Sequence, residues 1–172
     1  GWQWGGGWLA SIGFSDFAGS TLVHSTGGAA ALAGIVILGP RFGRFDNKGN
    51  PKSIQPFAAS SIPLVTIGVF VLWLGWFGFN GGSQLAIASF ADAVAISSIF
   101  INTNLAACGG VLAAAIVTRL MFGKTDVIQM LNGAIGGLVA ITAEPLAPSP
   151  LAAILIGAAG GVIVVFGTKL LF

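Results

Sequence analysis

The chain has 172 residues, of which 55% are hydrophobic and only 7% charged, and its formal net charge is +2. Soluble domains carry about 25% charged residues, so this chain is too apolar to cover a water-facing surface. The small net charge argues against nucleic acid binding, and the single cysteine, Cys108, excludes an internal disulfide framework. We therefore expect an all-α integral membrane protein.

Five apolar runs follow one another along the sequence and form one domain over residues 1–172. A membrane-spanning helix needs about 20 apolar residues, a length that only the fourth run clearly lacks. Pro63 fits the first turn of the second run, where its missing N–H costs little. We expect five spans, at about 17–38, 57–80, 93–118, 127–143 and 151–171.

The charged residues between the runs predict the orientation. If five spans alternate across the membrane, every Lys and Arg falls on one side, whereas Asp16, Asp92 and Glu144 fall on the other. Basic loops face the cytoplasm in membrane proteins. We therefore expect a multi-pass protein of the cell membrane, with its N-terminal end outside and its C-terminal end inside. The basic residues are Arg41, Arg44, Lys48, Lys52, Arg119, Lys124 and Lys169.

The first run contains one histidine, His24, with an acid eight residues before it. A polar ring inside a membrane span must find a partner or a water-filled cavity, so His24 indicates a transport pathway. Asp16 lies near the expected helix start, where a carboxylate caps free backbone N–H groups. An Asn at this position should keep much of such a cap. A role of Asp16 as a simple cap and a role in binding a cation both stay open.

The second run ends in "LWLGWFGFNGGS", residues 72–83. Trp76 and Phe79 are three residues apart and share a helix face, which Asn80 and Ser83 continue with hydrogen-bonding groups. Aromatic faces beside hydroxyls can bind a small cation, and the same reasoning applies to Trp4 in "WQWGGGW". A belt of aromatic side chains at the membrane interface is the alternative interpretation.

The remaining polar residues inside the runs predict hydrogen bonds between helices rather than a site. The segments "GAIGG" at 133–137 and "GAAGG" at 157–161 predict faces of close helix contact. Metal ligands, cofactor motifs and nucleophile–base pairs do not stand out, so we expect no metal, no cofactor and no enzyme. The polar residues in question are Asn102, Thr103, Asn104, Gln129, Asn132 and Thr142.

Four motifs resemble the ammonium transporter family, Amt/Mep/Rh, in the order in which that family has them. They are "DFAGSTLVHSTGGAAALAG", "LGWFGFNGGS", "NTNLAA" and "NGAIGGLVAIT", and the resemblance runs from end to end of the chain. It implies an eleven-helix fold with an inverted repeat and a homotrimeric assembly. The chain is similar to the fifth to ninth spans, so we expect a fragment of that fold.

The resemblance also implies a function and the residues that perform it. Ammonium would be recruited outside and ammonia conducted through a hydrophobic pore, with a cytoplasmic PII-type regulator as a possible partner at the basic loop 39–56. A plain topogenic loop is the alternative for that segment, and an ammonium-sensing membrane protein without net transport is the alternative function. The implied residues are Trp4, Ser83 and Asp16 for recruitment, Phe79 for the gate, and His24 and Trp76 for the pore.

Overall fold

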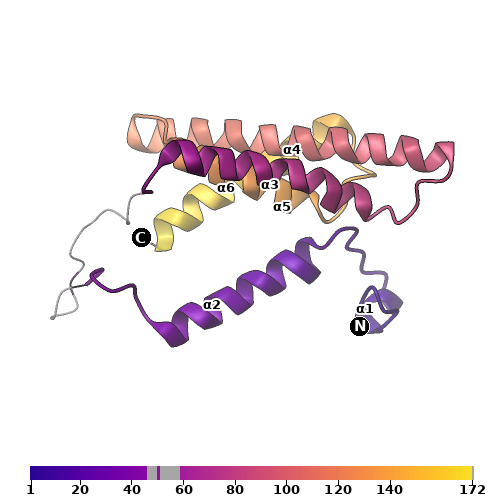
Figure 1. Cartoon of the computed structure of the whole chain (residues 1–172), viewed down its shortest axis with the longest axis horizontal. Coiled ribbons are helices and arrows are strands. Elements are labelled where there is room, and N and C mark those ends of the chain that lie inside the picture. Colours follow the sequence, from indigo (N-terminus) through magenta and orange to yellow (C-terminus); the bar gives the residue numbers. More distant parts are fainter. Residues whose placement is uncertain (46–49, 51–58, 172) are drawn as a thin grey trace.

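A computed structural model describes residues 1–45, 50 and 59–171, and its regular elements are helices (Figure 1). This helical content confirms the expected all-α class. The elements are α1 (Trp8–Ser11), the π-helix η1 (Ser20–Ser25), α2 (Thr26–Leu38), α3 (Ile62–Gly82), α4 (Phe90–Phe122), α5 (Val127–Ile141) and α6 (Pro150–Leu171).

Local sequence explains where these helices begin and end. Ser89 and Asp92 form a capping box at the start of α4, and the Asp126 side chain caps α5. Gly39 and Gly123 follow α2 and α4 with φ of 72° and 73°, a conformation that favours glycine. The start of α5, the end of α2 and both ends of α4 therefore coincide with a capping side chain or a glycine.

Four helices of the described chain are long and apolar enough to cross a membrane. At 1.5 Å per residue, the 15 residues of α5 extend only about 22 Å, less than the roughly 30 Å of a bilayer core. The 33 residues of α4 extend about 50 Å, well past the expected limits of 93–118. Because α5 is shorter than the bilayer core, its role as a fifth span remains a prediction. The four long segments are Ser20–Leu38, Ile62–Gly82, Phe90–Phe122 and Pro150–Leu170.

Helices α4, α5 and α6 pack against one another through glycines. Gly110 on α4 lies against Gly133 on α5, and Gly160 on α6 lies against Gly136 on α5. A Cβ atom built on Gly157 would overlap the carbonyl oxygen of Ala106. The predicted contact faces at 133–137 and 157–161 are thus confirmed, since small residues let the backbones approach closely.

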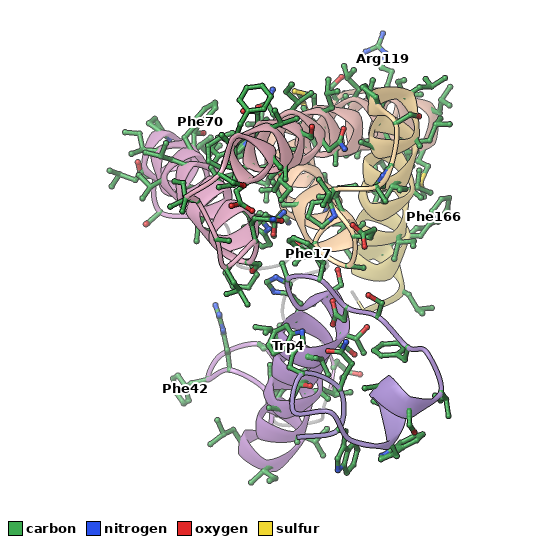
Figure 2. All side chains as sticks on the ribbon, turned by 90° about the vertical axis from the view of Figure 1, so that its right-hand side faces the viewer. Trp4, Phe17, Phe42, Phe70, Arg119 and Phe166 are labelled. Carbon is green, nitrogen blue, oxygen red and sulfur yellow. The ribbon has the colours of Figure 1, made fainter. Side chains whose placement is uncertain are left out.

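Helix α3 lies on α4 and α5, whereas α2 lies apart. Trp76 on α3 is buried in a cluster with Ala107 and Leu138. Helix α2 contacts η1 but none of the other described helices, and Figure 1 shows it separated from the bundle of α3 to α6. In Figure 2 the labelled side chain of Phe17 lies at the junction between the bundle and this N-terminal part.

The helix ends that carry basic residues lie at one end of the molecule. Figure 1 shows the ends of α2, α4 and α6 on the side of the C-terminus, opposite the N-terminus. Of the basic residues, Lys48 and Lys52 lie outside the described residues, as does most of the predicted regulator-binding loop at 39–56. The others follow α2 or lie in or beside the last turns of α4 and α6; they are Arg41, Arg44, Arg119, Lys124 and Lys169.

Glycine packing leads to a stability prediction. Gly157→Ala should destabilise the fold, because overpacking typically costs about 1–3 kcal/mol. Gly167, on the same helix, has nothing within 4 Å of an added Cβ, so Gly167→Ala should be neutral or slightly stabilising. Thermal unfolding in detergent micelles, followed by circular dichroism, compares the two. Equal midpoints would show that the contact at Gly157 yields without cost.

Candidate functional site

The Asp16 carboxylate is buried and accepts four backbone hydrogen bonds. The residue is 1% exposed. Its Oδ1 accepts the N–H groups of Gly19 and Ser20, both at 3.0 Å, and its Oδ2 accepts those of Thr21 and Leu22 at 2.9 and 2.8 Å. These are donors that a helix start leaves free, so the carboxylate caps η1 and lies at its positive end.

The capping residue lies four positions before the first residue of the helix, because the chain turns sharply at Gly19. Gly19 has a φ of 113°, and a Cβ there would crowd the Val23 side chain at the start of the helix. Regular structure therefore begins at Ser20 rather than at the expected residue 17. It begins with π-helical turns, in which the N–H of His24 donates to the Gly19 carbonyl at 2.9 Å. Such turns are rare and often occur at functional sites.

The segment around this turn is fastened to the last turn of α5. Carbonyl oxygens at the end of a helix lack intrahelical donors, and here the N-terminal segment supplies them. The three bonds are Phe17 N–H to Ala143 O at 2.7 Å, Ala18 N–H to Thr142 O at 3.0 Å, and the Ser20 hydroxyl to Val139 O.

Trp4 and Ser83, the two predicted recruitment residues besides Asp16, make different contacts. The Trp4 indole N–H donates to the main-chain oxygen of Asp16 at 2.7 Å, and the side chain is 57% exposed. The Ser83 hydroxyl donates to the Phe79 carbonyl of its own helix at 2.8 Å. The structure therefore brings Trp4 to the Asp16 turn, while Ser83 is bonded at the end of α3 and not to either residue.

Three predicted pore and gate rings come together between η1 and α3. The His24 ring stacks on Trp76 with centroids 4.9 Å apart and an interplanar angle of 18°. It also lies 5.4 Å from the Phe79 ring, and the Trp76 and Phe79 centroids are 5.8 Å apart. Among the described residues the buried Nε2 atom of His24 has no hydrogen-bond partner. We refer to these three side chains as the ring cluster.

A buried polar network supports the ring cluster from behind. The Trp76 indole N–H donates to the Thr142 hydroxyl at 2.8 Å. That hydroxyl lies 2.6 Å from the Leu138 carbonyl and 3.2 Å from Asn80 Oδ1, and Asn80 Nδ2 donates to Thr103 at 3.0 Å. Trp76, Asn80, Thr103 and Thr142 are all buried. Buried polar groups need such partners, so this network joins α3, α4 and α5 in one arrangement.

Sequence reasoning missed the link from Thr142 to Trp76, although it predicted hydrogen bonds between helices for the polar residues inside the runs. That prediction is confirmed for Thr103 and Thr142, and Asn102 donates to Pro145 O and Pro148 O at 3.0 and 2.8 Å. The available signal was a threonine near the end of an apolar run, which does not reveal its partner.

Within the described residues no three His, Cys, Asp or Glu side chains gather as metal ligands.

The four long apolar helices define a multi-pass α-helical membrane protein, with the ring cluster between two of its segments. The model of the Ammonium Transporter Family matches residues 1–172. The chain therefore belongs to this family, as the motifs implied.

Similar proteins agree with this assignment. Ammonium transporter Amt2 of Archaeoglobus fulgidus is 44% identical over 176 residues, which cover 96% of this chain and 36% of that protein. The crystal structure of Candida albicans Mep2 matches with a TM-score of 0.82 and 34% identity, over 98% of this chain and 36% of that one. A solved structure of a sensor Amt protein matches with a TM-score of 0.83 and 37% identity, over 93% and 38%. The chain thus spans little more than a third of the length of these proteins.

The geometry of the Asp16 cap revises the expectation for Asn at this position. Both carboxylate oxygens accept two N–H groups, and an amide nitrogen cannot accept any. Asp16→Asn should therefore leave two backbone N–H groups facing a donor and destabilise the fold by about 1–3 kcal/mol.

The matched control is Asp126→Asn, which should cost only a few tenths of a kcal/mol. Asp126 caps α5 through Oδ1 alone, which accepts from Ile128 and Gln129. Thermal unfolding of both variants in detergent gives the comparison. An Asp16→Asn protein as stable as Asp126→Asn would contradict the four-bond cap.

Proposed function

We propose that this chain forms part of a membrane pathway that recruits ammonium on the outer side and conducts it inward as ammonia. The observation that carries the proposal is the ring cluster, in which His24 stacks on Trp76 beside Phe79. These are side chains to which the family resemblance assigns the pore and the gate, and they lie together although they come from separate helices.

The chemistry of the cluster suits a neutral solute better than an ion. A charged ammonium ion is very costly to place among apolar rings unless it is paired, so deprotonation before passage lowers the barrier. A neutral imidazole supplies one donor and one acceptor and adds no fixed charge. Among the described residues the Nε2 atom of His24 is buried and lacks a hydrogen-bond partner, so a small neutral solute that reached it would satisfy a polar atom that is otherwise unpaired.

Recruitment of the cation is assigned to Trp4, Ser83 and Asp16. The indole of Trp4 is more than half exposed, so its face can attract a small cation. The Asp16 carboxylate is saturated by four N–H groups, so we assign it an indirect role. It holds the turn whose carbonyl oxygen orients Trp4. Ser83 adds a hydroxyl at the end of α3.

A sensing function is the second candidate, favoured by the similarity to a structure described as a sensor Amt protein. A sensor of this family would keep the recruitment residues and the ring cluster and show no net transport. Uptake of labelled methylammonium into vesicles that contain the complete protein distinguishes the two. A homotrimeric assembly and a contact of segment 39–56 with a PII-type regulator complete the proposal.

The role of His24 can be tested in the complete protein, as encoded by its open reading frame. His24→Ala removes the imidazole from the ring cluster, so uptake should fall by about tenfold or more, or selectivity over other cations should be relaxed. Ser25→Ala, a change at an exposed neighbouring position, is the control and should transport normally. The measurements are uptake and current in reconstituted vesicles. Normal rate and selectivity in His24→Ala would reduce this ring to a packing element.

The proposed orientation places the turn between α4 and α5 in the cytoplasm and the segment between α5 and α6 outside. Lys124→Cys and Ala147→Cys, each in a Cys108→Ala background, put single thiols at exposed positions of these two segments. An impermeant thiol reagent added to whole cells should label position 147 and not 124. The reverse pattern would overturn the orientation.

A further inference from the structure

We propose that Thr142 is a positioning residue that fixes the ring of Trp76 and the turn before His24 relative to each other. The proposal rests on the proposed function insofar as it concerns transport, but its structural content can be tested separately. Thr142 follows the last residue of α5 as its C-cap and is fully buried.

The side chain of Thr142 holds the Trp76 ring. The Trp76 indole N–H is directed at the Thr142 oxygen at 2.8 Å, in an environment closed to water. The Thr142 hydroxyl donates its hydrogen bond to the Leu138 carbonyl at 2.6 Å, and Asn80 Oδ1 is a more distant acceptor at 3.2 Å. The hydroxyl therefore donates into its own helix and accepts from Trp76, so the indole cannot rotate without leaving a buried donor unsatisfied.

The main chain of Thr142 holds the other half of the ring cluster. Its carbonyl oxygen accepts the N–H of Ala18 at 3.0 Å. The next residue, Gly19, accepts the N–H of His24 in the π-helical turn at 2.9 Å. The backbone path from Thr142 to His24 therefore consists of two hydrogen bonds and one peptide unit, and none of it depends on a flexible side chain.

Thr142 thus contacts both sides of the stack between His24 and Trp76, one through its hydroxyl and the other through its carbonyl oxygen. The rings in that stack have centroids 4.9 Å apart and an interplanar angle of 18°. The α5 segment that carries Thr142 is itself held by glycine contacts with α4 and α6, which leave no space for a shift. A residue that merely filled space would affect stability alone, whereas a positioning residue also changes the ring geometry.

The experiment uses the complete protein in three variants. Thr142→Val keeps the shape and removes the hydroxyl, and Thr142→Ser restores the hydroxyl. Thr118→Val is the matched control, because Thr118 is equally buried but, among the described residues, its hydroxyl bonds only to carbonyls of its own helix, at Ala114 and Ala115. Nuclear magnetic resonance of protein labelled in its tryptophan and histidine rings reports the Trp76 N–H and the His24 ring protons, which are assigned by their loss in Trp76→Phe and His24→Ala.

We expect changes only in the resonances of Trp76 and of the His24 ring that stacks on it. In Thr142→Val the Trp76 N–H resonance should move to the position of an indole without a hydrogen bond, and the ring protons of His24 should shift because the stacked ring moves. Thr142→Ser should restore both signals and Thr118→Val should leave both unchanged. An unchanged Trp76 resonance in folded Thr142→Val would overturn the proposal, and so would an equal change in Thr118→Val.

The transport result separates positioning from recruitment. Thr142→Val should lower the maximal uptake rate by about tenfold, with little change in the half-saturating concentration, because the outer residues are untouched. In a Trp76→Phe background, where no indole N–H needs an acceptor, Thr142→Val should fold and should not slow uptake further. Additive losses in the double variant would overturn the proposal. Unchanged uptake in His24→Ala would instead count against the proposed function and leave the resonance test standing.

Discussion

The four backbone N–H groups that converge on the Asp16 carboxylate form the contact on which the rest of the site depends. A buried carboxylate is stable only when its oxygens are hydrogen-bonded, and here the start of a helix provides the donors. The same turn directs a carbonyl oxygen at Trp4 and leads into the π-helical turns that carry His24. Trp4 and His24, the residues proposed for recruitment and for the pore, are therefore both oriented by one acid.

The end of α5 is the second element that several parts of the site share. Its last carbonyl oxygens accept bonds from the segment after Asp16, while the Thr142 hydroxyl accepts the Trp76 N–H. The end of α5 is held rigidly because α5 packs between α4 and α6 at glycine positions, where the backbones touch without intervening side chains. Although α5 extends only about 22 Å, its end thus contacts both the segment that leads into η1 and the Trp76 side chain on α3.

The outward faces of the helices are apolar, as expected of a protein that lies in a membrane. Large apolar side chains such as Val36, Ile37 and Leu38 on α2 are 74%, 83% and 85% exposed, as suits lipid or helix neighbours rather than water. The charged ends of the helices lie beyond these apolar faces. Arg119 and Lys169 are in last turns, where cations also interact favourably with the helix dipole. Membrane burial and helix electrostatics therefore favour the same arrangement of charges.

The sequence by itself determined the class of the protein and its family, and it indicated which side chains to consider as a candidate site. Apolar runs of about 20 residues with few charges predict helices in lipid. The glycine segments predicted the tight contacts of α5 and α6 because their spacing places them on one helix face. The proximity of His24 to Trp76 was implied by the family motifs, not by the 52 positions that separate them in the chain. For Asp16 the position left a helix cap and cation binding open, and the structure shows the cap.

Only the tertiary structure decided how these side chains are held. A threonine near the end of an apolar run carries no sign of its partner, because the Trp76 indole comes from a different helix whose rotation is set by packing. The number of N–H groups at Asp16 depends on the left-handed turn at Gly19 and on the π-helical start, which hydrophobic periodicity does not encode. Hydrogen bonds between distant segments follow from the relative position of the helices, and that position is a property of the packed molecule.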